Sequence, residues 1–195
     1  MIKASRLNFL YESSDEKTKR LVIKQLEFYI LDNPQFTDRY NFEWLSDIFM
    51  ALSFNRVYKA AYMEQSEILS TLRKAMQDAE KESIALLEEE SKNPNFINTL
   101  TKKAMKYKKK NIGYGWKIDF PPSSERELRI TVDQCLVRKI CMKYEANYLI
   151  PLFCGLHQYQ FETLSGIYFI CSDQLMQGAK CCDFTIRSKL NENKN

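Results

Sequence analysis

The spacing of apolar residues changes near residue 113, and this change limits the fold more than any other feature of the sequence. Before it, apolar residues recur at helical spacing in segments that end at breaks such as Asn33-Pro34. After it, residues 116–120 and 128–133 alternate between apolar and polar side chains, as strands do. We therefore expect an α+β protein with a helical N-terminal half.

The second half predicts the element order β-β-α-α-β-β. A Pro121-Pro122 turn separates the first two strands, which indicates an antiparallel hairpin. Helical patterns then begin near Cys135 and Pro151, and two more strands are expected over 167–171 and 182–186. Helices should cover one face of this antiparallel sheet, and the other face should be covered by the N-terminal helices or form a pocket.

The length of 195 residues and the hydrophobic fraction of 45% allow one buried core with a helical extension. We expect residues 1–112 to form the helical region and residues 113–190 to form the α+β core. The tail over 191–195 is rich in asparagine and lysine, so it should fray.

Four helical segments are expected in the first half. A Ser13-x-x-Glu16 capping box should open the first helix. The second begins near Asn41, and Asn55 could break it or cap the next one. Segment Arg56–Ser91 contains neither Gly nor Pro, so it predicts one long helix or two with a bend. A shorter helix follows Asn93-Pro94.

A loose apolar stripe runs along Arg56–Ser91. It could pack inside the fold, form the seam of a homodimer, or serve a helix-mediated interaction protein, and packing inside the fold is favoured because the stripe covers few heptads. Its members are Ile68, Leu72, Ala75 or Met76, and Ala79.

Charge and hydropathy argue against nucleic acid and membrane partners. The 29 basic and 25 acidic residues leave a net charge of only +4. The lysines of Lys102–Lys110 could bind phosphate, but they also suit a solvated helix end, and no arginine or aromatic stacking motif accompanies them. No apolar run reaches the roughly 20 residues that span a bilayer, and the N-terminus lacks the features of a signal peptide. We expect a cytoplasmic protein.

The unusual chemistry gathers in Pro151–Arg187, which holds four of the six cysteines and the only histidine. Cytosolic reductants should keep the cysteines as thiols. The chain contains no Cys-x-x-Cys pair, and Cys154-x-x-His157 alone is weak spacing for a metal, so we expect neither a metal nor another cofactor.

Two pairs in this stretch bear on catalysis. Cys154 and His157 lie three apart on an expected helix, where a thiolate–imidazole pair could form; the alternative is a buried apolar thiol beside a satisfied histidine. Cys182 and Asp183 are strand neighbours and should face opposite sides unless a bulge near Gly178 intervenes. Asp183 could serve catalysis or cap a nearby turn or helix.

Three pieces of the second half carry a family resemblance. They are a strand running into a cysteine over Ile130–Cys135, a Pro151-Leu-Phe-Cys154 step, and a closing Gly-x-x-x-Cys-Asp-Phe over Gly178–Phe184. In this order they resemble the L-2-amino-thiazoline-4-carboxylic acid hydrolase family across Gly113–Arg187. The closing motif is also similar to the end of small-molecule-binding domains related to vinyl reductases.

The resemblance implies a hydrolase of a small heterocyclic or amide-like carboxylate. Such an enzyme adds water at the ring carbon between nitrogen and sulfur. It needs a base or thiolate, a donor for the departing group, and a cation for the substrate carboxylate. The alternative is a binding or sensory domain of similar fold without turnover, in which the cysteines line an apolar pocket.

By the same resemblance the catalytic candidates are Cys154, His157 and Asp183. The family pattern usually has an acidic residue where this chain has His157, and this difference changes the charge expected at the site. Cys135 and Cys182 are expected near the substrate. Arginines that could hold its carboxylate are Arg129, Arg138 and Arg187, with Arg138 and Arg187 preferred.

Overall fold

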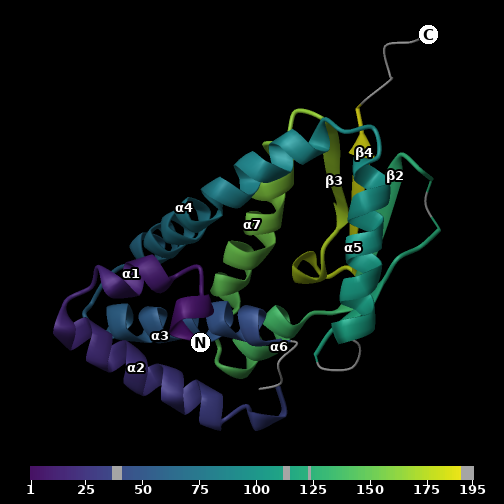
Figure 1. The fold of residues 1–195 in the computed structure, drawn as a ribbon. Coiled ribbons are helices and arrows are strands. Elements are labelled where there is room, and N and C mark those ends of the chain that lie inside the picture. The colour runs from purple at the N-terminus through teal and green to yellow at the C-terminus, as the bar shows by residue number, and fades with distance from the viewer. Residues whose placement is uncertain (37–40, 112–114, 123, 190–195) are drawn as a thin grey trace. The chain divides into compact units, whose positions relative to one another are not determined.

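The computed structural model describes residues 1–36, 41–111, 115–122 and 124–189, and it confirms an α+β protein with a helical N-terminal half (Figure 1). The helices are α1 Asn8–Glu12, α2 Glu16–Leu31, α3 Phe42–Ala60, α4 Gln65–Ser91, α5 Phe96–Asn111, α6 Leu136–Lys143 and α7 Ile150–Glu162. The strands are β1 Lys117–Asp119, β2 Glu127–Gln134, β3 Ile167–Asp173 and β4 Cys182–Ser188. The predicted order β-β-α-α-β-β is therefore confirmed. In the described part of the chain, no helix is long and apolar enough to cross a membrane.

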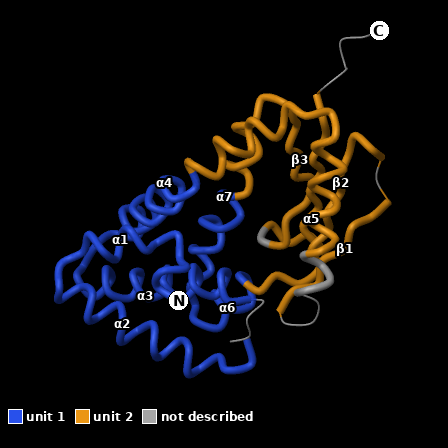
Figure 2. Tube along the Cα trace, viewed as in Figure 1, with its two compact units in different colours: residues 1–80, 137–156 blue, residues 81–136, 157–195 orange. Residues whose placement is uncertain are grey.

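The chain divides into two compact units, which Figure 2 colours separately. Unit 1 contains residues 1–80 and 137–156, and unit 2 contains residues 81–136 and 157–195. Helices α4 and α7 each contribute to both units. The boundary that we expected at residue 113 and the tail over 191–195 both lie outside the described residues.

Helix α3 forms the centre of unit 1 and is buried on all sides over most of its length. Every residue from Leu45 to Asn55 is buried, so the helix cannot be amphipathic. Helix α2 packs against it, with the Tyr29 ring stacked on Phe49 at 6.1 Å between centroids. The expected break at Asn55 is wrong, because tertiary packing carries the helix through this residue to Ala60.

The structure also corrects the start of the first long helix and divides segment Arg56–Ser91 between two helices. Asp15, not Ser13, caps α2: its Oδ1 accepts a hydrogen bond of 2.9 Å from the Thr18 amide. Of the two alternatives for this segment, the structure has two helices and not one: α3 ends at Ala60, the chain turns at Tyr62, whose φ is 61°, and α4 follows. The stripe on α4 is buried at Ile68, Leu72 and Met76 and exposed at Ala79.

A buried ion cluster fixes the N-terminal segment in unit 1. The Arg6 guanidinium donates to both Asp47 and Glu80, whose side chains are 1% and 8% exposed. Ser5 Oγ donates a second hydrogen bond to Asp47, at 2.9 Å. Burial alone lowers the pKa of Arg6, but the two carboxylates outweigh it and raise this pKa. The residues come from α3, α4 and the chain before α1, so the cluster ties three segments together.

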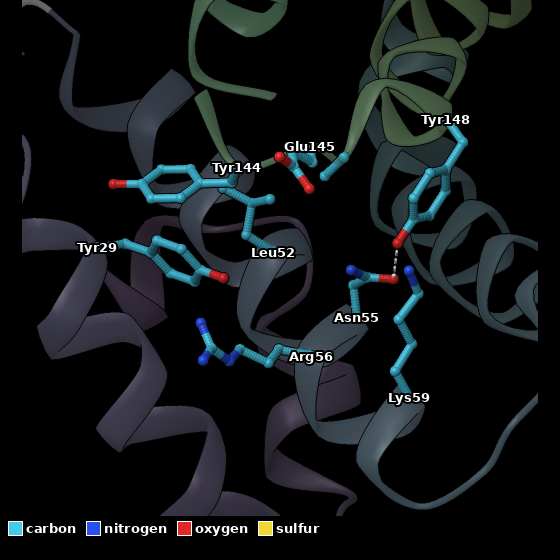
Figure 3. Close-up of a pocket in the computed structure, with 9 residues that line it drawn as sticks. Tyr29, Leu52, Asn55, Arg56, Lys59, Tyr144, Glu145 and Tyr148 are labelled. Atoms are coloured by element: carbon cyan, nitrogen blue, oxygen red, sulfur yellow. Dashed lines mark hydrogen bonds between the residues drawn. The ribbon is translucent and has the colours of Figure 1, made fainter. Parts of the chain in front are cut away.

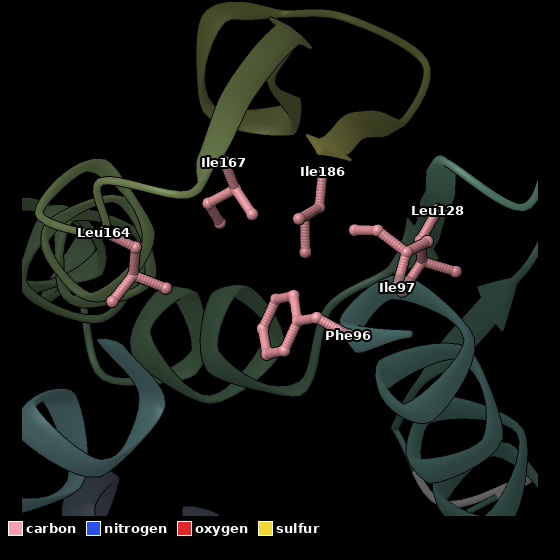
Figure 4. Close-up of a cluster of buried hydrophobic side chains, with 6 residues drawn as sticks. All are labelled: Phe96, Ile97, Leu128, Leu164, Ile167 and Ile186. Atoms are coloured by element: carbon pink, nitrogen blue, oxygen red, sulfur yellow. The ribbon is translucent and has the colours of Figure 1, made fainter. Parts of the chain in front are cut away.

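Unit 2 is built on a four-stranded sheet in the order β1-β2-β4-β3 with every pair antiparallel, which confirms the predicted hairpin of β1 and β2. Helix α5 packs against β2 and β4. Figure 4 shows the side chains that meet between them: Phe96, Ile97, Leu128, Leu164, Ile167 and Ile186. The core therefore covers one face of the sheet, and side chains of the alternate residues, such as Arg129 and Asp183, lie on the other.

The lysine-rich end of α5 is exposed where its side chains are described. Lys102, Lys103 and Lys106 face solvent, and Lys103 Nζ lies 3.0 Å from Glu90 Oε2. The side chains of residues 107–111 lie outside the described residues. The described lysines fit a solvated helix face.

Candidate functional site

Cys154 and His157 both lie on α7, as their spacing predicted. The helix begins with Ile150-Pro151, and proline is tolerated in a first turn because its missing amide hydrogen has no helical acceptor there. Leu152, Phe153 and Leu156 are buried and fix which side of the helix faces inward. Cys154 and His157 are both half-buried, one helical turn apart at the edge of this apolar side. The two side chains therefore occupy neighbouring positions on one helix.

Cys182 and Asp183 lie on opposite faces of β4, as strand alternation predicted. Their pairing with Val132 and Thr131 of β2 is regular, and the irregularity in the sheet lies on β3 between Cys171 and Asp173. Cys182 is buried on the same face as Ile186, and its Sγ accepts from the Leu175 amide at 3.3 Å. These two neighbours do not line one cavity.

Asp183 forms a cross-strand ion pair. Its Oδ2 accepts from Arg129 Nη2 at 3.0 Å, and its side chain is 17% exposed. Its Oδ1 is buried and has no hydrogen-bond partner among the described residues. The interpretation of Asp183 as a turn or helix cap is wrong, because its carboxylate is directed to Arg129 of β2. This pairing also occupies one of the arginines considered for a substrate carboxylate.

The remaining predicted residues come from several elements of both units. Cys135 is half-buried just before α6, and Arg138 is exposed on that helix. Arg187 is exposed on β4, where its guanidinium lies 5.7 Å from the centroid of the Tyr168 ring. Cys154 and Arg138 belong to unit 1, and the other predicted residues belong to unit 2. All six cysteines are described, and all six are thiols.

No group of three histidine, cysteine, aspartate or glutamate side chains that could hold a metal ion occurs in the described ranges.

A pocket of about 200 Å³ in unit 1 is the feature that sequence reasoning missed (Figure 3). One wall is α3, which contributes Leu52, Asn55, Arg56 and Lys59. These residues follow the spacing i, i+3, i+4 and i+7, so they lie along one face of the helix. The polar residues Asn55, Arg56 and Lys59 on one helical face were the sequence feature that could have revealed this wall of the pocket.

The connection between α6 and α7 forms the opposite wall, with Tyr144, Glu145, Ala146 and Tyr148. It begins with a Schellman motif: the Ala146 amide donates to the Cys141 carbonyl at 2.8 Å, and the Glu145 amide donates to the Met142 carbonyl at 3.2 Å. Glu145 takes the left-handed position of this motif with φ 53°, where glycine is usual.

Hydrogen bonds and ring contacts orient the side chains that line the pocket. Tyr148 Oη donates to Asn55 Oδ1 at 2.8 Å, and Lys59 Nζ lies 4.5 Å from the centroid of the Tyr148 ring. Figure 3 shows the Asn55 amide nitrogen and the Tyr29 hydroxyl directed into the same space, whereas the Tyr144 hydroxyl points away. Burial raises the pKa of Tyr29, while the nearby Arg56 guanidinium acts in the opposite direction, so this hydroxyl stays protonated at neutral pH.

Comparison with known families identifies the chain. The family model for L-2-amino-thiazoline-4-carboxylic acid hydrolase matches residues 46–186. The chain belongs to this family. The match runs from α3 to β4, so the matched range contains the residues of α3 that line the pocket as well as α7 and β4. A search of curated proteins found no match.

Solved structures of H-NOX proteins align with most of the chain at low identity. A mutant Fe(II) unliganded H-NOX protein from K. algicida has a TM-score of 0.42 and 12% identity, covering 98% of this chain and 96% of that chain. The H-NOX domain from Shewanella oneidensis in the Fe(II)CO state has a TM-score of 0.33 and 10% identity, covering 89% and 95%. These TM-scores give no basis for transferring a fold or a ligand.

Proposed function

We propose that this hydrolase-like protein opens the ring of a small 2-aminothiazoline-type carboxylate, or of a related cyclic amidine, by adding water. The observation that supports the proposal is the family match over residues 46–186, which contains every residue assigned a catalytic role. In the reaction, the water oxygen bonds to the ring carbon between nitrogen and sulfur, and the bond from that carbon to sulfur breaks. One water proton goes to the ring nitrogen and the other to the departing thiolate.

Cys154 and His157 are assigned the central roles. The Cys154 thiolate would attack the ring carbon, or His157 would take a proton from the attacking water, and both roles need side chains that reach the same substrate. Their shared position on α7, half-buried and one turn apart, supports this assignment. The histidine stands where the family usually has an acid, so it would supply the base without adding a second negative charge near the substrate carboxylate.

Asp183 is assigned a weaker role. Its carboxylate is held by Arg129 on the face of β4 opposite Cys182, so it would orient a neighbouring group by its charge or accept a hydrogen bond from that group through Oδ1. Cys135, Cys182, Arg138 and Arg187 stay as proposed substrate contacts. Among them, exposed Arg138 and Arg187 could provide the cation.

Turnover of 2-amino-thiazoline-4-carboxylate tests the proposal directly. The released thiol is followed with a thiol reagent after protein removal, in the wild-type protein and in the variants Cys154→Ala and His157→Gln. We expect each variant to lose at least about 100-fold in kcat, the lower range for a positioned acid, base or nucleophile. Cys181→Ala is the matched control, since Cys181 is also a half-buried thiol but has no assigned role.

Full turnover by Cys154→Ala would remove the nucleophile and leave His157 as base. A wild-type protein that binds thiazoline or carbamoyl compounds but forms no product would favour the alternative function, a small-molecule-binding domain. The pocket in unit 1 is the observation that favours this alternative.

A further inference from the structure

The pocket of unit 1 contains charges of both signs. Arg56 and Lys59 supply two cations from one face of α3, and Glu145 supplies a carboxylate from the connection opposite. None of the three forms an ion pair with another side chain of the described ranges. Figure 3 shows the Glu145 carboxylate and the Arg56 guanidinium on opposite sides of the space between them.

Polar donors around the pocket suit a carboxylate. The Tyr148 hydroxyl occupies Asn55 Oδ1, which directs the amide nitrogen of this buried residue and its two hydrogens toward the pocket. The Tyr29 hydroxyl adds a further donor beside Arg56. A carboxylate bound here would receive charge-assisted hydrogen bonds from Arg56 or Lys59 and neutral ones from Asn55 and Tyr29.

The backbone at Glu145 points to a role for its side chain. A left-handed conformation is costly for a residue with a Cβ atom, and glycine or asparagine would fill this Schellman position at lower cost. Strained positions of this kind concentrate at ligand sites. With φ 53° the backbone places Glu145 at the pocket, across the space from Arg56.

We propose that this pocket binds a small zwitterion, a molecule with a carboxylate at one end and a cationic amine or amidine at the other. The carboxylate would lie against Arg56, Lys59 and the Asn55 amide, and the cationic nitrogen against Glu145. A simple anion would leave Glu145 facing negative charge, and an uncharged ligand would complement none of the three charged groups. A volume of about 200 Å³ suits one ring with one or two substituents, because an apolar cavity of about 150 Å³ holds benzene.

Three related probes separate the two charges. 2-Amino-thiazoline-4-carboxylate has both groups, thiazole-4-carboxylate has only the carboxylate, and 2-amino-thiazoline has only the cationic amidine. The first probe comes from the proposed function, but the inference concerns binding alone. Calorimetric titration of the full chain should give the tightest Kd for the zwitterion.

Substitutions of exposed side chains then assign each end of the ligand. Arg56→Gln and Lys59→Gln should each weaken the two carboxylate-bearing probes at least about tenfold, the loss of one charge-assisted contact. Glu145→Gln should weaken the two amidine-bearing probes and leave thiazole-4-carboxylate unchanged or tighter. Lys24→Gln, at an exposed lysine of α2 in the same unit, is the matched control and should change no Kd.

Several results would overturn the inference. They are no binding of the zwitterion at millimolar concentration, affinities within twofold of wild type for Arg56→Gln and Lys59→Gln, or equal affinity for the zwitterion and thiazole-4-carboxylate. Loss of the predicted binding pattern while wild-type turnover proceeds would overturn this inference and keep the proposed hydrolysis. Binding that follows the predicted pattern, without any turnover, would support the zwitterion pocket and contradict the proposed hydrolysis.

Discussion

Gly166 lies where the turn before β3 passes the end of α4, and this close approach gives a sharp test of the fold of unit 2. A Cβ atom added at Gly166 would lie 2.6 Å from the carbonyl oxygen of Ser91 and 3.0 Å from its Oγ. The nearest atom belongs to the backbone, so no side-chain rotation relieves the contact. Gly166→Ala should therefore force the turn and the end of the helix apart.

The structure around Gly166 resists that displacement on both sides. The amide and hydroxyl of Ser165 donate to the two Glu88 carboxylate oxygens, the amide at 2.8 Å. The Lys189 amide donates to the Gly166 carbonyl at 2.9 Å. Overpacking of a tight site costs about 1–3 kcal/mol, and an anchored turn belongs in the upper part of that range. A loss of about 2–3 kcal/mol would lower the Tm of a chain of this size by roughly 4–12 °C.

Gly155→Ala is the matched control. It makes the same chemical change in the middle of α7, where the added Cβ meets nothing within 4 Å. Removing glycine from a helix interior gains about 0.5–1 kcal/mol, so this variant should be more stable than wild type. Urea unfolding followed by far-ultraviolet circular dichroism would measure both variants. We expect the free energy of unfolding to fall in Gly166→Ala and to rise in Gly155→Ala.

Wild-type stability in Gly166→Ala would refute the close approach of Gly166 to Ser91. Loss of stability in Gly155→Ala would contradict the open space that the structure shows beside Gly155 on α7. Hydrogen exchange at the Ser165 and Lys189 amides adds a local measurement, because both should exchange faster in Gly166→Ala than in Gly155→Ala if the turn is displaced.

Two further substitutions test the polar contacts of the fold. Arg6→Met should lower the free energy of unfolding by about 2–3 kcal/mol in urea titrations, because Asp47 and Glu80 lose their cation. This is somewhat less than the roughly 3–5 kcal/mol lost when a fully buried pair is broken. Arg20→Met, at an exposed residue, should change the free energy of unfolding little, and an equal loss there would contradict the role of the Arg6 cluster. Glu88→Gln tests pH dependence. The hydroxyl and amide of Ser165 lower the pKa of Glu88 below its usual 4.5, so its carboxylate stabilises the fold above that pH and the contribution is lost as the pH falls through the lowered pKa. The stability difference between wild type and Glu88→Gln should shrink from pH 6 to pH 3, and a constant difference would contradict the reasoning.

The parts of the fold that the sequence could predict are those with a local cause. Strand alternation depends only on side chains two positions apart, and it placed Cys182 and Asp183 on opposite faces of β4. The hairpin of β1 and β2 follows from a proline turn between two alternating segments. The start of α5 after Asn93-Pro94 likewise depends on residues within one turn of each other.

The parts that could not be predicted depend on contacts across long stretches of chain. The segment from Ala60 to Glu64 has neither glycine nor proline, yet the chain turns there with Tyr62 in the left-handed region. Asparagine is a common residue at helix ends, but Asn55 is buried and bonded to Tyr148, and α3 continues through it. The partner of Asp183 is 54 residues away on another strand.

The Cys154–His157 pair and the pocket of unit 1 also differ in how far apart their residues lie in the sequence. Both involve residues near the start of α7, so their tests can be combined. Cys154 and His157 could be found because they share one helix, whereas the pocket combines residues 29, 52–59 and 144–148. Tyr148 of the pocket lies just before α7, so Cys154 follows it by six residues, a rise of roughly 10 Å along the helix axis. A ligand between Arg56 and Glu145 would therefore lie near the first turns of the helix that carries Cys154, and both belong to unit 1. If Arg56→Gln raises KM while Cys154→Ala lowers kcat, one substrate uses both. If only one of the two effects is seen, the pocket and the thiol serve different molecules.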